Sequence, residues 1–261
     1  MKKIFVVFFL SFLFIGCSKT NSSAIAPKTN ASSEQDIFDD FDDFDNEFET
    51  QAVYDPLEGY NRIMTSFNDK VYIYLLEPIA STYAYIVPRG GRVAIKNFFY
   101  NIETPVRLTN NALQFKFKRA SIEGGRFVVN TVFGLGGFFD PAKSDLGWES
   151  YDEDFGQTLG SYGVGEGIPI VLPLLGPSNI RDSVGLAADS FISPLPYLGN
   201  HIFDYDIPQT TTMGAVIKAY KVINKTSLQL GQYESIKKDA LDFYPFLRDS
   251  YKQLREQQIK E

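Results

Sequence analysis

The chain of 261 residues has only one cysteine and one histidine. A single cysteine excludes a disulfide within one molecule, and a lone His201 leaves metal sites and nucleophile–base pairs without the side chains that they need. The segment Gly134–Gly137 lacks the third glycine of a dinucleotide fingerprint, and Ser161 does not lie in a G-x-S-x-G elbow. We therefore expect no enzymatic activity, no metal site and no cofactor.

Positive charge is also scarce, with 25 lysine and arginine residues against 32 acidic ones and a net charge of −7. This balance argues against nucleic acid as a partner, because phosphate binding needs clustered basic side chains. The acidity is local. Residues 34–49 hold nine acidic side chains and no basic one, so the chain from residue 51 on is close to neutral.

The apolar run Ile4–Gly16 follows two lysines and has thirteen residues, which as a helix reach ~20 Å of a ~30 Å hydrocarbon layer. It is typical of a secretory signal peptide, over residues 1–16. Phe14–Cys17 resembles the bacterial lipobox, so we expect Cys17 to carry a diacylglyceryl group and an amide-linked chain such as palmitate. The alternative is an ordinary signal peptide with a chance thiol.

Residues 17–53 read as a flexible tether that contains the acidic segment. Within it, Phe38, Phe41, Phe44 and Phe48 recur at spacings of three and four residues, which in a helix gives one aromatic face between carboxylates. Two interpretations stay open: a short motif that folds against a basic, apolar groove on a partner, or a solvated acidic linker.

A helical body is expected over residues 54–230, followed by a C-terminal helix over 231–261. It opens with Asp55 as a cap and Pro56 in the first turn, and apolar residues at helical spacing predict a helix over 57–76 that Glu77-Pro78 ends. Pro245 is expected to kink or divide the last helical pattern. The patterns after the first run over 91–101, 105–115, 119–133, 179–192, 209–230 and 232–256.

Between these patterns lies a glycine-rich stretch over 134–167, with short helices expected only near Asp140-Pro141 and over 154–159. The next ten residues, IPIVLPLLGP, carry a proline at every fourth position, which excludes a regular helix and a central strand. No alternating strand pattern is evident. We expect this segment to be extended and its apolar side chains to need a cover of protein or lipid.

Several long strings of the body resemble the MlaA family, also called VacJ lipoproteins. They are DPLEGYNR at 55–62, NFFYNIETPV at 97–106, NTVFGLGGFFDPA at 130–142 and FGQTLGSYGVGEGIPIVLPLLGPSNIRDSVG at 155–185. The resemblance runs from about Asp55 to Leu198 and returns faintly in FLRDSYKQ at 246–253. It leaves the acidic segment unexplained.

The resemblance implies a mainly α fold: a ring-like bundle of amphipathic helices with a Gly/Pro-rich irregular segment, embedded in one membrane leaflet. It implies a lipid-anchored protein in the periplasmic leaflet of a Gram-negative outer membrane, and Ser18 after Cys17 fits that sorting. Members remove mislocalised phospholipids through an amphipathic channel, and so maintain lipid asymmetry. Their partners are phospholipid, an outer-membrane porin and a soluble periplasmic carrier of the MlaC type. The competing interpretation is a scaffold lipoprotein that bridges a porin and envelope components without transport.

In family terms, residues 144–164 correspond to a hinge-like loop beside the channel. Arg181 and Asp182 are expected to form an ion pair that supports the fold, with contact to a headgroup as the alternative. The candidate lipid path consists of Phe138, Phe139, Phe155, Ile170 and Leu172. The candidate gating glycines are Gly147, Gly156, Gly160 and Gly163.

Overall fold

The computed structural model describes residues 54–195 and 211–261. They belong to one compact unit, Tyr54–Glu261, which is described below. The predictions made for Cys17, for Phe38–Phe48 and for His201 lie outside the described residues.

The body opens with a long helical stretch in which α2 (Glu58–Val71), the π-helix η1 (Tyr72–Leu76) and α3 (Glu77–Ile86) follow without a break. The prediction that Glu77-Pro78 ends the first helix is wrong. The N–H of Glu77 donates to the carbonyl of Tyr72, five residues back. This wider π turn comes directly before Pro78, whose ring would otherwise meet the carbonyl four residues earlier. The chain therefore passes the proline and remains helical.

The remaining helices confirm the expected mainly α fold. Each apolar pattern between residues 91 and 230 corresponds to a helix whose ends differ from the expectation by a few residues. They are α4 (Arg89–Ile102), α5 (Thr104–Leu113), α6 (Phe117–Val132), α9 (Ile180–Ile192) and α10 (Thr211–Leu228). The two short helices expected in the glycine-rich stretch are α7 (Pro141–Ser144) and α8 (Phe155–Ser161).

The proline-rich stretch is extended, as expected, and it forms a hairpin although its sequence shows no alternating strand pattern. Strands β1 (Pro169–Leu172) and β2 (Gly176–Asn179) pair antiparallel. The second edge of β1 is covered by amide side chains of α2. The Asn61 amide donates to the Pro169 carbonyl (3.1 Å) and accepts from the Val171 N–H (2.8 Å). These contacts take the place of the hydrogen bonds that a third strand would make. Periodicity along the sequence does not reveal such contacts.

The C-terminal part consists of α11 (Gln232–Asp239) and α12 (Phe243–Lys260). Pro245 lies in the first turn of α12, and the Asp242 carboxylate caps that helix by accepting from the Tyr244 N–H (3.3 Å). The expected division of the last helical pattern is therefore confirmed. Proline suits the first turn because its missing N–H has no partner there in any case.

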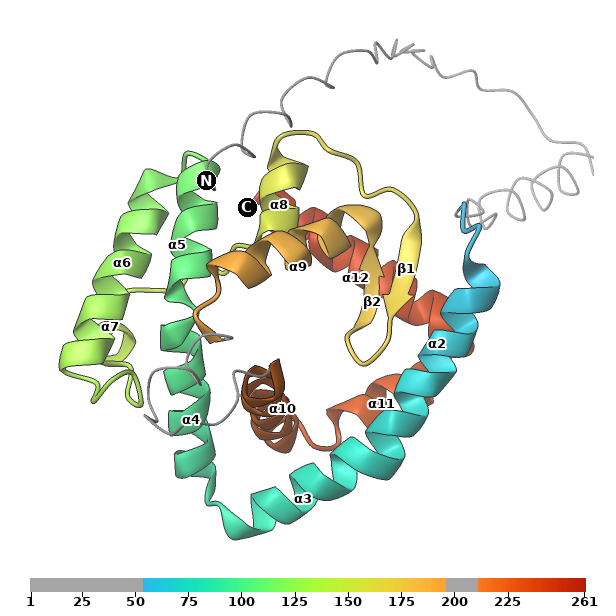
Figure 1. Ribbon diagram of the computed structural model, residues 1–261, viewed down its shortest axis with the longest axis horizontal. Helices are drawn as coiled ribbons and strands as arrows, with labels where there is room; N and C mark the ends of the chain where they lie inside the picture. Colours follow the sequence, from blue (N-terminus) through green and yellow to red (C-terminus); the bar gives the residue numbers. More distant parts are fainter. Residues whose placement is uncertain (1–53, 196–210) are drawn as a thin grey trace, which may run out of the picture. The chain divides into compact units, whose positions relative to one another are not determined.

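The elements of this unit form a closed circuit of contacts, as Figure 1 shows. The long stretch α2–η1–α3 leads to α4 and α5, and α5 packs against α6, α8 and α9. Helix α12 packs against α8 and contacts α2, and the hairpin contacts α2 as well. Helix α10 packs against α3 and α4.

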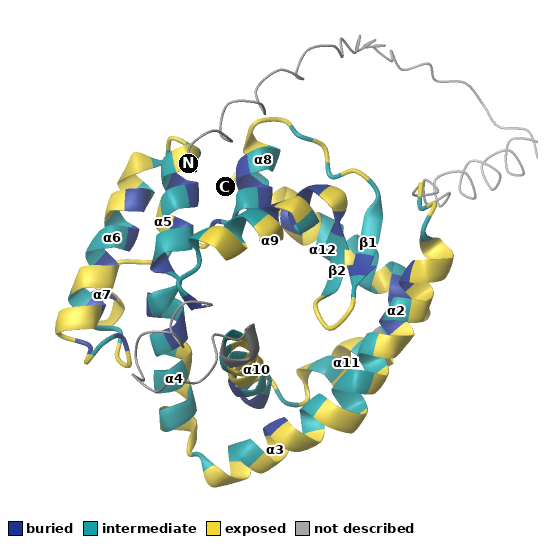
Figure 2. Cartoon of the chain, viewed as in Figure 1, coloured by how far each residue is buried: buried dark blue, intermediate teal, exposed yellow. Residues whose placement is uncertain are grey.

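The distribution of polar and apolar side chains is the reverse of that in a water-soluble domain. Among the described residues, seven apolar side chains are buried, against nineteen polar or charged ones. Exposed residues occur along most helices, as Figure 2 shows. Many of them are large and apolar, and the side chains of Tyr74, Tyr85 and Phe191 are each more than three-quarters exposed. Within the same ranges, no helix is long and apolar enough to cross a membrane.

Candidate functional site

Most of the buried side chains of α5 and α6 are charged or carry an amide. Glu123 of α6 has no exposed surface, and its carboxylate accepts from the Arg107 guanidinium of α5 (2.8 Å). The other carboxylate oxygen accepts from the Tyr151 N–H (2.8 Å). The guanidinium also stacks over the Tyr100 ring, 3.6 Å from its centroid. A buried ion pair needs such additional partners, because burial otherwise costs several kcal/mol per charge.

The segment 144–164, expected to be hinge-like, is held firmly over its middle. Its Trp148 carbonyl accepts from Arg126, its Tyr151 N–H is bound to Glu123, and its Glu153 carboxylate accepts from Lys116 (2.7 Å). These contacts reach back to α6 and to the turn between α5 and α6. Residues 148–153 are therefore held against the body, while the two ends of the segment lie outside these three contacts.

Two of the four candidate gating glycines lie at those ends. Gly147 and Gly163 adopt left-handed φ angles of 65° and 83°, and a Cβ atom at either position would meet nothing within 4 Å. Both positions favour glycine because other residues adopt this backbone conformation only at a cost. Gating at these two positions remains a prediction.

The other two, Gly156 and Gly160, lie within α8 and are packing positions. A Cβ atom at Gly156 would lie 2.5 Å from an Asp182 carboxylate oxygen, and one at Gly160 would lie 2.6 Å from the Ile259 side chain. Across the helix pair, a Cβ atom at Gly185 of α9 would lie 2.4 Å from the Gly156 backbone nitrogen. Close contact of α8, α9 and α12 thus accounts for glycine at these two positions, and a gating role for them stays a prediction.

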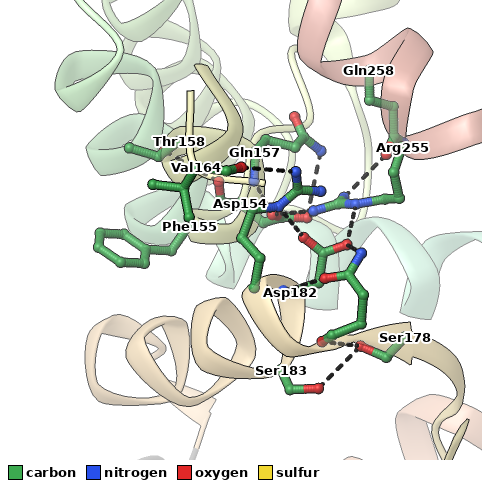
Figure 3. A network of polar contacts seen from close by, with 12 residues as sticks. Asp154, Phe155, Gln157, Thr158, Val164, Ser178, Asp182, Ser183, Arg255 and Gln258 are labelled. Carbon is green, nitrogen blue, oxygen red and sulfur yellow. Dashed lines mark hydrogen bonds and ion pairs between the residues drawn. The ribbon is translucent and has the colours of Figure 1, made fainter. Parts of the chain in front are cut away.

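Asp182 at the start of α9 is the centre of a buried polar network (Figure 3). Its carboxylate accepts from Arg181 (2.9 Å), from Arg255 (2.8 Å) and from the Tyr251 hydroxyl (2.8 Å). Burial opposes ionisation, but the hydrogen bonds from Arg255 and Arg181 outweigh it and hold the pKa of Asp182 below its ordinary value. The expected ion pair of Arg181 with Asp182 is confirmed.

Arg255 of α12 links this network to α8. Its guanidinium donates twice to the Asp154 carboxylate, over distances of 2.7 Å and 2.8 Å. Asp154 in turn caps α8 by accepting from the Gln157 N–H (2.8 Å). One guanidinium therefore joins α8, α9 and α12, which sequence reasoning did not identify. The available signal was the faint FLRDSYKQ match, which ends two residues before Arg255.

Another carboxylate, that of the half-buried Asp189 of α9, accepts from the Asn110 amide (2.8 Å) and from the Phe155 N–H (3.0 Å). Burial raises the pKa of Asp189, and its two hydrogen bonds offset this only in part. Over residues 54–195 and 211–261, no group of three or more histidine, cysteine, aspartate or glutamate side chains is placed to hold a metal ion.

The five residues of the candidate lipid path lie in three different parts of the circuit. Phe138 stacks on Phe98 of α4, with ring centroids 4.8 Å apart. Phe155 begins α8, which packs against α9, whereas Ile170 and Leu172 lie in β1, which packs against α2. Phe139 is 58% exposed, and Phe155, Ile170 and Leu172 are half-buried. The structure thus does not gather them into one pocket.

A mainly helical body with a polar interior and broad apolar surfaces defines a class of proteins that are built for contact with lipid or with other proteins. A family model described as MlaA lipoprotein matches residues 53–258. The chain belongs to the MlaA family, as its sequence motifs indicate.

Individual relatives agree with this assignment. The chain is 32% identical over 204 residues to the Escherichia coli K12 protein named intermembrane phospholipid transport system lipoprotein MlaA, covering 77% of this chain and 76% of that one. A protein of Rickettsia felis is 30% identical over 216 residues, or 82% of each chain. A solved structure from work on the structural basis for maintenance of bacterial outer membrane lipid asymmetry has a TM-score of 0.66 and 33% identity. It covers 78% of this chain and 98% of the solved chain.

Proposed function

We propose that this protein is an outer-membrane lipoprotein that removes mislocalised phospholipids and passes them to a periplasmic carrier, so that the membrane keeps its lipid asymmetry. Membership of the MlaA family and the name of the E. coli relative support this function. The observation that carries it is the reversed burial pattern. Polar and charged groups are satisfied inside the body, while large apolar side chains are exposed around it.

Helix α2 illustrates how this pattern suits one leaflet of a bilayer. Its Ile63 side chain is 64% exposed and Phe67 is 45% exposed, while Asn61 and Thr65 are buried on the opposite face. An amphipathic helix with exposed apolar residues lies in the interface of a membrane with that face toward the acyl chains. We infer that the body is sunk into the periplasmic leaflet, with phospholipid headgroups meeting its polar groups.

The route for lipid is proposed to pass through the middle of the circuit as an amphipathic channel. The uncovered face of α9 contributes Val184 and Phe191, which are 54% and 79% exposed. Gly147 and Gly163 would let the ends of the 144–164 segment move beside it. Two cysteines introduced to cross-link this segment to the body should block lipid removal, and a reductant should restore it. Unchanged lipid asymmetry in the cross-linked protein would contradict the gate.

Acylation of Cys17 is proposed to deliver the body to the outer membrane, with a porin and a carrier of the MlaC type as partners. A Cys17→Ser protein should be mislocalised and should fail to remove phospholipid, although its body folds normally. Fractionation of the two membranes measures the location, and circular dichroism measures the fold.

The decisive experiment measures phospholipid in the outer leaflet of a deletion strain. We expect accumulation that the wild-type chain reverses. The scaffold alternative predicts no accumulation. Purification with native lipid extraction separates the two further, because a conduit retains bound phospholipid, whereas a scaffold holds its protein partners without it.

A further inference from the structure

The turn between α5 and α6 has the backbone of a glycine motif but carries phenylalanine. The N–H of Lys116 donates to the Asn111 carbonyl (2.9 Å), and the N–H of Phe115 donates to the Ala112 carbonyl (3.0 Å). These two bonds make a Schellman cap, in which the residue after the cap is left-handed and is usually glycine. Phe115 takes that position with a φ of 60°.

Neither aromatic side chain of this turn is buried by packing within the body. Phe115 is 72% exposed and Phe117 is 61% exposed, and their rings contact each other edge to face with centroids 6.2 Å apart. A left-handed conformation disfavours a side chain with a Cβ atom, and exposure of a phenyl ring to water is also unfavourable. A phenylalanine whose backbone conformation and exposure are both unfavourable indicates that its ring contacts something outside the chain.

The same combination occurs wherever a non-glycine residue of the described ranges is left-handed. The other two are Leu135 and Leu174, with φ angles of 53° and 65°, and they are 70% and 69% exposed. Asparagine and aspartate are the residues that usually tolerate this conformation. Their replacement by large apolar residues at three turn tips points to an apolar environment around those tips.

Charge distinguishes the α5–α6 turn from the other two tips. Lys116, Lys118 and Arg119 lie beside the two phenylalanines, in a chain whose net charge is −7. Lys116 pairs with Glu153 at 2.7 Å, and Arg119 lies 3.6 Å from the same carboxylate. Arg119 also donates to the Glu261 main-chain oxygen (2.8 Å). Lys118 is exposed and forms no ion pair with any residue that the structure describes.

We propose that residues 115–119, which we name the basic-aromatic tip, bind anionic phospholipid at the membrane surface. Phe115 and Phe117 insert among the acyl chains, and Lys118, with Lys116 and Arg119 beside it, contacts the headgroup phosphates. Aromatic rings next to lysine and arginine are typical of segments that bind anionic bilayers. The inference rests on the proposed function and adds a lipid preference to it.

The test uses the chain from residue 17 to 261 with Cys17→Ser, so that no acyl anchor masks the contribution of the tip. Its partition is measured onto vesicles of phosphatidylcholine, with or without phosphatidylglycerol. Phe115→Gly should weaken binding to the anionic vesicles about tenfold (about 1.4 kcal/mol), because a phenyl ring no longer inserts. The same change should raise the Tm of the protein, since glycine fits the left-handed position. A purely structural role predicts the opposite change in Tm.

Charge reversal provides the matched pair. Lys118→Glu should weaken binding to anionic vesicles more than about fivefold and leave neutral vesicles unaffected, since the loss of one lysine near such a surface already costs about fivefold and the new carboxylate adds repulsion. Lys225→Glu on α10 changes the net charge equally and should have less than half that effect. Inorganic phosphate at equal ionic strength should not compete. Competition would identify a site for free phosphate and overturn the lipid assignment.

Two further outcomes separate the possibilities. If the wild-type chain binds anionic vesicles and both tip variants bind as well as it does, the inference fails and the proposed function stands. If neither the wild-type chain nor any variant binds vesicles of either composition, both the inference and the proposed function fail. If the tip instead binds the acidic segment 34–50, Lys118→Glu should bind vesicles more tightly than the wild-type chain does. That result would also overturn the inference.

Discussion

Removal of the Arg255 guanidinium should destabilise the body more than the loss of any single surface ion pair. The side chain is 8% exposed and binds two carboxylates, Asp182 (5% exposed) and Asp154 (39% exposed). Arg255→Ala leaves Asp182 buried with one arginine fewer, and breaking a buried pair costs about 3–5 kcal/mol. We take the lower end, about 3 kcal/mol, because solvent screens the more exposed Asp154.

The free energy of unfolding is measured by urea denaturation in mild detergent, followed by circular dichroism. The matched control is Arg248→Ala, also on α12, whose guanidinium pairs with the half-exposed Asp249 at 2.7 Å. A surface pair contributes about 0.2–1 kcal/mol. Arg255→Lys keeps the charge but loses the two-pronged contact with Asp154, so its cost should fall between the two. Equal losses for the alanine variants of Arg255 and Arg248 would refute the role given to this network.

Three further changes test other parts of the body. The pKa of Asp182 lies below its ordinary value of 3.8, so the unfolded chain takes up a proton at this carboxylate first and stability falls as the pH drops below about 4. The difference in unfolding free energy between wild type and Asp182→Asn should therefore become smaller below that pH. A difference that stays constant with pH would contradict the reasoning. Gly185→Ala places a Cβ 2.4 Å from the Gly156 nitrogen and should cost about 1–3 kcal/mol, whereas Gly59→Ala, with open space around it, should raise stability by about 0.5 kcal/mol in the same denaturation assay. Asn61→Leu leaves main-chain groups of the hairpin without partners and should cost about 2–4 kcal/mol, with faster hydrogen exchange confined to the hairpin; unchanged exchange would show that the amide does not support β1.

Helix positions are predictable from this sequence because apolar residues repeat at helical spacing whether a helix faces a protein core or a lipid. The pattern at 91–101 corresponds to Arg89–Ile102, and that at 119–133 to Phe117–Val132. Periodicity does not tell which face is buried. In α6 the buried stripe is Glu123, Arg126 and Asn130, while Val132 and Phe133 are exposed. This polar stripe at spacings of three and four residues was visible in the sequence.

The features that sequence reasoning missed depend on contacts between distant segments. Pro78 continues a helix because a π turn precedes it, and local propensity favours a stop there. The hairpin over 169–179 depends on two amide side chains of α2, Asn61 and Asn68, the latter donating to the Leu172 carbonyl (2.9 Å). Arg255 acts on residues about 70 and 100 positions earlier in the chain, which no local pattern reports.

The reversed burial pattern also governs which substitutions the family can accept. In a water-soluble domain the interior changes by exchange among apolar residues of similar volume. Here an interior position such as Glu123 or Asn61 must keep both donors and acceptors at fixed places, so acceptable changes are few and come in compensating pairs. The exposed apolar positions need only remain apolar. Sequence drift should therefore be fast on the outside and slow within, and the polar residues, rather than the aliphatic ones, should mark descent from a common ancestor.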